Sequence, residues 1–266
     1  MTPAELYQAA IDDTLALLRA LPPSPGKTVP LSPEVAELLS RAAATPAEQV
    51  ALSVDEEPVA RVQAPPAAAP ALDSGDVADA LSALAAVVRG CEKCALCKTR
   101  TQTVFGVGNI QADLVFVGEA PGADEDAQGE PFVGKAGQLL TDIIVKGMKM
   151  KREDVYICNV LKCRPPNNRN PNPEEMSLCE PYLIRQLSLI RPKVICALGG
   201  VASKCLLQTE ASVGQLRGRW HNYQGIPLRV TYHPAYLLRT PSDKGKTWED
   251  IQEVMKVLSG EVIPDV

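Results

Sequence analysis

The chain has 266 residues, of which 45% are hydrophobic and 22% charged, and its net charge is −5. This length allows one large domain or a domain with a tail, and the net charge does not by itself suggest a protein that binds nucleic acid. Residues 1–90 hold 5 basic and 12 acidic residues, a net charge of −7, and residues 91–266 hold 22 and 20, a net charge of +2. The negative net charge of the whole chain therefore comes from residues 1–90, and the remainder is mildly basic.

The chain shows no signal-peptide pattern and no apolar run of about 18 residues, the length of a membrane-spanning helix. It contains eight cysteines. In the reducing cytoplasm, clustered cysteines bind metal more often than they form disulfides. We therefore expect a cytoplasmic protein without membrane contacts, whose cysteine clusters are candidate metal ligands.

Residues 1–75 are predicted to form an acidic, Pro/Ala-rich and largely disordered extension. A capping box at residues 2–5 precedes a short helix with one apolar stripe, formed by Tyr7, Ile11, Leu15 and Leu18. Residues 55–76 consist mainly of Pro, Ala and acidic residues, which cannot bury enough apolar surface to fold, so they read as a flexible linker. For the helix that carries Tyr7 to Leu18 we favour a weak, partly ordered element; the alternative is a helix that docks on a partner protein.

The folded domain is expected over residues 76–266. It opens with a helix whose apolar face is followed by Gly90 as a stop signal. Four short apolar segments predict strands, at residues 114–117, 155–160, 194–198 and 228–232. Helical patterns accompany them at residues 135–148, 173–190 and 248–258, and a further helix follows the third strand and ends at residue 207. This alternation predicts an α/β domain with a parallel sheet that helices cover on both faces.

The segment of residues 118–140 follows the first strand and is rich in acid. Its carboxylates are Glu119, Asp124, Glu125, Asp126 and Glu130. It also carries Phe132 and no basic residue before Lys135, which argues against a phosphate cradle and favours acid/base chemistry or charge stabilisation. For Asp124 and Asp126 we expect a solvated loop position.

Three polar residues follow or end different predicted strands. Glu119 follows the first, Asn159 ends the second and His233 follows the fourth. Carboxyl ends of parallel strands meet at one edge of the sheet, so these side chains are expected to form a pocket. The other histidine, His221, lies in a polar turn and is expected at the surface.

The cysteines divide into a candidate metal set and core residues. Cys91 and Cys94 form a C-x-x-C motif, and Cys163 and Cys179 stand sixteen residues apart. Four thiolates with this mixed spacing fit an iron–sulfur cluster at least as well as zinc. Cys97 extends the motif and could replace a neighbouring ligand. The remaining cysteines lie in apolar segments and are expected in the core: Cys158, Cys196 and Cys205.

Three motifs carry a resemblance to a known family. They are GEAPGADEDAQGEPFVGKAGQLL, YICNVLKCRPPNNRNP and HPAYLLR, and a C-x-x-C motif precedes them. Together they resemble the family 4 uracil-DNA glycosylases, the iron–sulfur branch of that superfamily, over about residues 91–258. The resemblance implies a three-layer α/β/α sandwich with a central four-stranded parallel sheet. It also implies a 4Fe-4S cluster on Cys91, Cys94, Cys163 and Cys179, with Cys97 outside the ligand set.

The resemblance also implies an activity, which is hydrolysis of the N-glycosidic bond of flipped-out deoxyuridine. Uracil would stack on Phe132, and the Asn159 amide would pair with its O4 and N3–H. His233 would stabilise the negative charge that develops on the leaving base.

The same resemblance places Glu119, Ala120 and Pro121 along the uracil and the water, and gives Glu125 a role at the uracil C5 edge or with the water. Ala120 stands where other glycosylases have an aspartate, so Glu119 and Glu125 are the two candidate acids. The partner would be single- or double-stranded DNA containing uracil, contacted in part by Arg164 and Arg169. We expect a monomer.

Three other readings compete with this one. A broader-range mismatch glycosylase is disfavoured by Glu119 and Asn159, and a DNA-crosslinking relative is disfavoured because residues 164–178 contain no histidine. The third is an iron–sulfur DNA-binding or replication-accessory module without catalysis. Residues 186–190 resemble a sliding-clamp-binding peptide, although they fall on a helix where core packing explains them. Phe132, Asn159 and His233 together favour catalysis.

Overall fold

The structure is a computed structural model that describes residues 74–264. The expected acidic extension and its candidate docking helix lie outside the described residues, apart from the last two positions of the extension. Among the described helices, none is long and apolar enough to cross a membrane.

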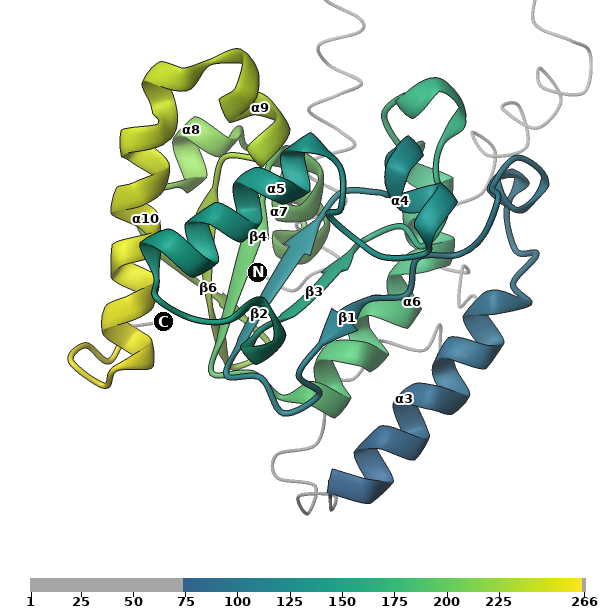
Figure 1. The fold of residues 1–266 in the computed structure, drawn as a ribbon, viewed down its shortest axis with the longest axis horizontal. Helices are drawn as coiled ribbons and strands as arrows, with labels where there is room; N and C mark the ends of the chain where they lie inside the picture. Colours follow the sequence, from purple (N-terminus) through teal and green to yellow (C-terminus); the bar gives the residue numbers. More distant parts are fainter. Residues whose placement is uncertain (1–73, 265–266) are drawn as a thin grey trace, which may run out of the picture. The chain divides into compact units, whose positions relative to one another are not determined.

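A six-stranded sheet forms the centre of the described part (Figure 1). Its spatial order is β1-β3-β2-β4-β6-β5. The strands span Val107–Gly108 (β1), Leu114–Gly118 (β2), Tyr156–Asn159 (β3), Val194–Leu198 (β4), Trp220–Tyr223 (β5) and Ile226–Thr231 (β6). The four inner strands run parallel, with Val117 of β2 level with Cys158 on one side and Ala197 on the other. The four predicted strands and their parallel direction are therefore confirmed.

The predicted number of strands was wrong, because β1 and β5 add an antiparallel strand at each edge. β1 has only two residues, too few for any periodic pattern. β5 reads Trp-His-Asn-Tyr, which is not an apolar run, and joins β6 through Gln224 and Gly225. Both residues have positive φ angles, 51° and 85°, as a tight two-residue hairpin requires.

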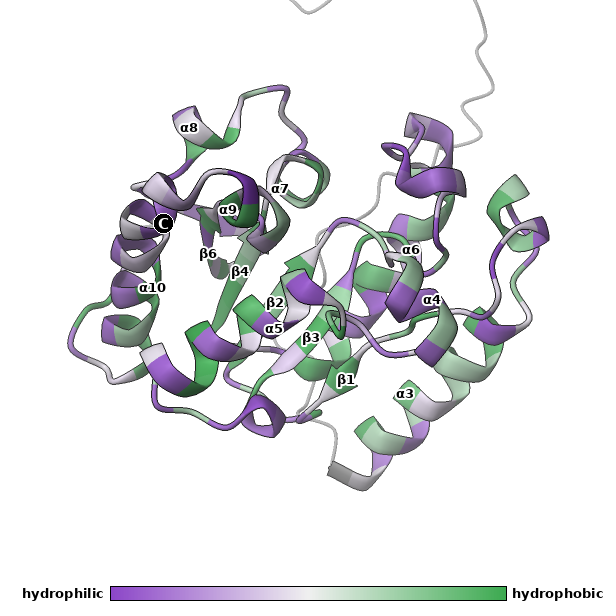
Figure 2. Ribbon diagram, turned by 45° about the horizontal axis from the view of Figure 1, so that its top comes forward, coloured by the Kyte–Doolittle hydropathy of each residue, from purple (hydrophilic) through white to green (hydrophobic). Residues whose placement is uncertain are grey.

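Helices cover both faces of the sheet, which confirms the predicted three-layer α/β/α sandwich. One face packs on α3 (Ser74–Arg89), α6 (Pro173–Ile190) and α7 (Gly200–Leu207), and the other on α5 (Lys135–Asp142), the π-helical turn Ile143–Gly147 and α10 (Lys244–Leu258). Alternate residues of one strand serve the two layers: Val115 and Val117 belong to the first core and Phe116 to the second. Hydropathy follows this division: the inner strands are mainly apolar, and the helices carry both apolar and polar residues (Figure 2).

Short elements complete the described part. They are α4 (Ala123–Gln128), α8 (Val213–Leu216), α9 (Pro234–Arg239) and the 3-10 turns Ala95–Lys98, Arg152–Asp154, Pro166–Asn168 and Pro241–Asp243. α4 lies inside the acidic segment that was expected to be a loop. Three acidic residues in its first turn favour a helix start through the helix dipole, namely Asp124, Glu125 and Asp126.

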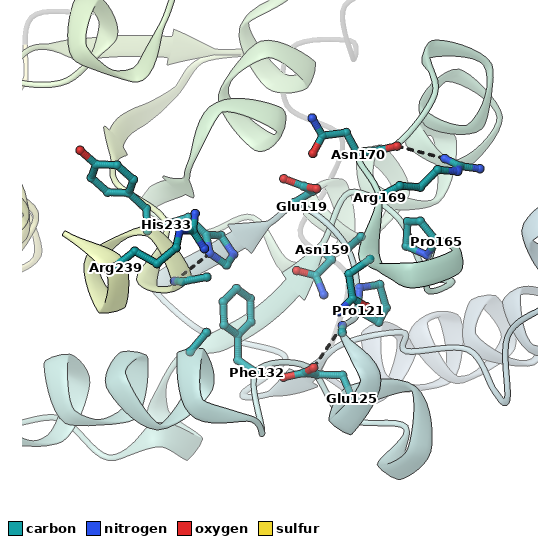
Figure 3. A pocket seen from close by; sticks show the side chains of 16 residues that line it. Glu119, Pro121, Glu125, Phe132, Asn159, Pro165, Arg169, Asn170, His233 and Arg239 are labelled. Carbon is teal, nitrogen blue, oxygen red and sulfur yellow. Dashed lines mark hydrogen bonds between the residues drawn. The ribbon is translucent and has the colours of Figure 1, made fainter.

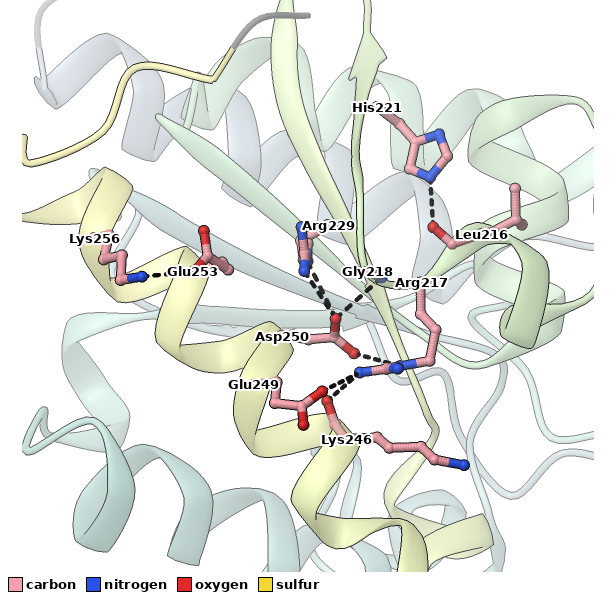
Figure 4. A network of polar contacts seen from close by, with 10 residues as sticks. All are labelled: Leu216, Arg217, Gly218, His221, Arg229, Lys246, Glu249, Asp250, Glu253 and Lys256. Atoms are coloured by element: carbon pink, nitrogen blue, oxygen red, sulfur yellow. Dashed lines mark hydrogen bonds and ion pairs between the residues drawn. The ribbon is translucent and has the colours of Figure 1, made fainter.

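A buried ionic network fastens α10 to the sheet (Figure 4). The fully buried Asp250 carboxylate accepts hydrogen bonds from Arg229 of β6, at 3.1 and 3.2 Å, and from Arg217 at 3.0 Å. It also accepts from the Gly218 backbone amide at 3.2 Å. One carboxylate thus joins α10, β6 and the segment between α8 and β5.

Candidate active site

The three strand ends singled out in the sequence meet in one cavity of about 410 Å³ (Figure 3). Glu119 follows β2, Asn159 ends β3 and His233 follows β6. Every substrate-side residue predicted from the sequence lines this cavity: Glu119, Ala120, Pro121, Glu125, Phe132, Asn159 and His233. Residues from α9 and from the segment 165–170 close the rim.

Phe132 forms a buried wall of the cavity. Its ring centroid lies 5.5 Å from that of His233, with a 33° tilt between the planes. Gly118, at the end of β2, leaves the room that the ring needs, because a β-carbon at this position would overlap both the Phe132 ring and the Asn159 amide. The glycine therefore allows an aromatic face and an amide to share one floor.

The Asn159 amide has unused hydrogen-bonding capacity. Its side-chain oxygen is buried, and it has no hydrogen-bond partner among the described residues. The Asn159 backbone is held separately, because Nζ of the buried Lys162 donates to its carbonyl at 2.7 Å. Buried polar atoms in proteins are nearly always paired, so an unpaired amide on a cavity floor indicates a site for a ligand with complementary polar groups.

His233 is held as a neutral imidazole. Its Nδ1 accepts a hydrogen bond from the Ala235 amide at 3.1 Å, which leaves the proton on Nε2. Burial, assisted by the positive charge of Arg239, lowers the pKa of His233 to about 4. At neutral pH the ring therefore offers one N–H donor and carries no charge.

The two candidate acids have different surroundings. The Glu125 carboxylate accepts from three loop amides, those of Val133 and Gly134 at 3.0 Å and that of Gly122 at 3.1 Å. The Glu119 carboxylate has no hydrogen bond to another described residue, and burial raises its pKa. Glu119 is therefore the acid with free oxygens at the cavity.

Comparison with known proteins agrees with this geometry. A sequence model of the uracil DNA glycosylase superfamily matches residues 105–252. A type-4 uracil-DNA glycosylase from Saccharolobus solfataricus is 44% identical over 193 residues, which cover 70% of this chain and 89% of the relative. The chain belongs to this family.

Two further relatives place the chain among the branches of the superfamily. A type-4 uracil-DNA glycosylase from Archaeoglobus fulgidus is 46% identical over 175 residues, 63% of this chain and 87% of the relative. A type-5 uracil-DNA glycosylase from Pyrobaculum aerophilum is 31% identical over 146 residues, 49% of this chain and 64% of the relative. The predicted resemblance to the type-4 branch is confirmed.

The four cysteines of the predicted cluster line one cavity of this glycosylase-family chain. Cys91 and Cys94 come from the segment after α3, Cys163 follows β3, and Cys179 lies on α6. Burial is the main cause that raises the pKa of the Cys94, Cys163 and Cys179 thiols, Cys163 to about 11. Thiols buried in this way need a cation to become thiolates.

Three hydrogen-bond donors point at these sulfurs. Arg100 donates to Cys163 Sγ at 3.2 Å, the Tyr182 hydroxyl to Cys91 Sγ at 3.3 Å, and the Lys162 amide to Cys179 Sγ at 3.3 Å. Donors of this kind stabilise the thiolates of iron–sulfur clusters and set their potential. Cys97 does not line this cavity and instead lines a neighbouring surface pocket.

In residues 74–264, no three His, Cys, Asp or Glu side chains are grouped closely enough to hold one metal ion. The other cysteines are buried in the core, as predicted: Cys158, Cys196 and Cys205.

One expectation for the acidic segment was wrong. Asp124 is exposed, as predicted, but Asp126 is only 3% exposed, and its carboxylate accepts from the Thr101 amide at 2.9 and 3.1 Å. It anchors the segment after the cysteines to α4. Sequence reasoning also missed Lys162 and Arg152, whose roles come from contacts with backbone carbonyls that no motif encodes.

Proposed function

We propose that this protein excises uracil from DNA by hydrolysing the N-glycosidic bond of deoxyuridine, which leaves an abasic site. The observation that carries the proposal is the cavity where a buried aromatic ring, an unpaired amide and a neutral histidine donor converge. The cavity is large enough to admit a base, and a base reaches it only when the nucleotide is flipped out of the helix. The partner is therefore uracil-containing DNA. We further propose that the protein acts in the cytoplasm as a monomer.

Base recognition follows from the floor of the cavity. Uracil stacks on Phe132, and the Asn159 amide offers a donor to O4 and an acceptor to N3–H. Cytosine presents an amino group and an unprotonated N3 at the same positions, so both hydrogen bonds are lost. Leaving buried polar groups unpaired in this way is a strong source of discrimination.

Charge stabilisation is assigned to His233 and Glu119. As the glycosidic bond breaks, negative charge grows on uracil O2 and positive charge on the sugar. The Nε2–H of His233 donates to O2. A fixed hydrogen-bond donor in a water-excluded site stabilises the transition state most when it points at the atom on which charge develops. The free Glu119 carboxylate stabilises the sugar cation or orients the water. Glu125 acts by holding the loop, because its oxygens are committed to backbone amides.

A 4Fe-4S cluster on Cys91, Cys94, Cys163 and Cys179 fits this site as a structural tie. When bound, it supplies a cross-link between the segment after α3, the loop after β3 and the start of α6. That loop continues through Arg164 to Arg169, and Arg169 lines the rim of the uracil cavity. We propose that these arginines contact the DNA backbone.

The deciding experiment is excision from an end-labelled oligonucleotide with one uracil, followed by alkaline cleavage. We expect cleavage at uracil and none at thymine or cytosine controls. His233→Ala should lower the rate by about 10²–10³-fold. His221→Ala is the matched control, because the His221 ring is hydrogen-bonded to the Leu216 carbonyl and does not line the cavity. No cleavage by iron-loaded protein would favour a non-catalytic DNA-binding module, and cleavage at mispaired thymine would favour a broader-range glycosylase.

The cluster has its own test. Iron content and visible absorbance should be lost in Cys163→Ser and kept in Cys97→Ser, because only Cys163 lines the shared cavity. Zinc in place of iron, or equal loss in both variants, would contradict the assignment.

A further inference from the structure

Phe132 has a strained backbone that the rest of the site must hold in place. Its φ angle is 55°, in the left-handed region that side chains other than glycine rarely adopt. The conformation turns the ring into the cavity, opposite His233. Without restraint, the segment 131–134 would relax to a more ordinary backbone and withdraw the ring.

Two side chains of opposite charge hold this segment: a carboxylate binds its backbone amides and a guanidinium binds its backbone carbonyls. The Glu125 carboxylate accepts hydrogen bonds from the backbone amides of Val133 and Gly134. The Arg152 guanidinium donates to the carbonyls of Pro131 at 2.7 Å and Phe132 at 3.0 Å. The backbone on both sides of Phe132 is thus fixed by charge-assisted hydrogen bonds, which are stronger than neutral ones.

Arg152 is itself fixed and desolvated. It lies on the 3-10 turn before β3, it is half-buried, and its third hydrogen bond goes to the Thr141 hydroxyl of α5 at 2.9 Å. Among the described residues it forms no ion pair, and its hydrogen bonds go to the backbone of Pro131 and Phe132 and to α5. Gly137 completes the seat, because a β-carbon there would overlap the Phe132 carbonyl.

Arg152 does not line the cavity of about 410 Å³. We propose that Arg152 is a positioning residue for the base: it holds Phe132 in its left-handed conformation and thereby sets the affinity of the cavity for uracil. This inference rests on the proposed function, since it takes uracil as the ligand of Phe132. It assigns Arg152 to base binding and not to contact with DNA phosphates.

The test separates base binding from DNA binding. Free uracil, as a competitive inhibitor, reports on the cavity alone. Duplex DNA with a tetrahydrofuran abasic analogue has no base and reports on backbone contacts. In Arg152→Gln we expect the inhibition constant of uracil to rise at least tenfold and the dissociation constant of the abasic duplex to change less than twofold. Guanidinium ion at millimolar concentration should restore part of the uracil affinity in Arg152→Ala.

Matched variants control for charge and folding. Arg185→Gln removes an exposed arginine of α6 and should leave both constants unchanged. Arg152→Lys keeps the charge but lacks the planar fork that reaches two carbonyls, so we expect an intermediate loss of uracil affinity. This variant provides the test if Arg152→Gln does not fold. Equal weakening of uracil and abasic DNA, or an unchanged uracil constant, would overturn the inference. A wild-type protein that neither releases nor binds uracil would instead overturn the proposed function.

Discussion

At the residue scale, burial acts in opposite directions on two groups of the same cavity. It lowers the pKa of His233 to about 4 and raises the pKa of Glu119 above its ordinary value. The charged form loses hydration in both cases, and that form is the protonated histidine and the deprotonated glutamate. The cavity thus holds a neutral donor across the physiological range and an acid that ionises later than an exposed one.

The sign of each shift predicts the pH profile of kcat/KM. His233 is already neutral above about pH 4, so its titration leaves no break near pH 6.5. Glu119 gains its charge only as the pH rises through its raised pKa, so activity should increase on the acid side and then level off. We expect this acid limb in the wild type and in His233→Gln, measured from pH 4.5 to 9, and its absence in Glu119→Gln. A limb near pH 6.5 that His233→Gln removes would contradict the assignment.

The same histidine also contributes to the pH dependence of folding. Its pKa is about 4 in the fold and about 6.5 in the unfolded chain, so the unfolded chain binds the proton more readily. The contribution of neutral His233 to the free energy of unfolding is complete above pH 6.5 and is lost as the pH falls towards 4.

The choice between uracil and cytosine is predicted to depend on the Asn159 amide. Asn159→Asp replaces the NH₂ donor by an acceptor that can receive the cytosine amino group, so excision of cytosine should become measurable while excision of uracil falls. The measurement is the ratio of kcat/KM for uracil and cytosine in the same duplex. Asn168→Asp, at the exposed rim of the cavity, is the control and should keep the wild-type ratio. An unchanged ratio in Asn159→Asp would remove Asn159 from base recognition.

At the scale of elements, the loop that carries His233 depends on how α10 and β6 are joined, because β6 ends directly before it. Asp250 is fully buried between Arg229 and Arg217, whose side chains are 5% and 15% exposed. Asp250→Ala would leave the buried Arg229 guanidinium without a counter-charge and Arg217 with only the exposed Glu249 as a partner. We expect a cost of about 3–5 kcal/mol in the free energy of unfolding.

Urea unfolding measures this change. Glu249→Ala is a close control, since Glu249 also pairs with Arg217 but is 70% exposed, and such a pair contributes about 0–1 kcal/mol. A loss in Asp250→Ala no larger than in Glu249→Ala would show that the network does not secure α10.

The elements that sequence patterns predict are those with a periodic apolar face or an uninterrupted apolar run. The bounds of α6 and β4 agree with the prediction at both ends, because each carries a continuous pattern and a clear stop. β1 is too short for any pattern, and β5 has a polar sequence at a sheet edge. The strand-end residues of the cavity were predictable because topology alone brings them together. Asp126 and Arg152 were not, since their partners are backbone groups 25 and about 20 positions away in the chain.

At the scale of the whole molecule, charge is segregated along the chain. Residues 1–73 hold 4 basic and 10 acidic residues, a net charge of −6, so the remaining residues carry 23 basic and 22 acidic ones, a net charge of +1. The described residues that line the uracil cavity and the cysteine cavity belong to the second part. The first part therefore adds negative charge to a protein whose proposed substrate is a polyanion.

Removal of residues 1–73 is predicted to leave kcat and iron content unchanged and to lower KM for uracil-containing DNA at low ionic strength. The reason is long-range repulsion, which acts over about 30 Å at 0.01 M salt and only about 8 Å at 0.15 M. The difference in KM between the full-length and shortened proteins should thus shrink as salt is added, and a salt titration of both measures it. A KM that rises on removal at every salt concentration would mean that the acidic segment helps to engage the DNA or a bound partner, which bulk repulsion cannot explain.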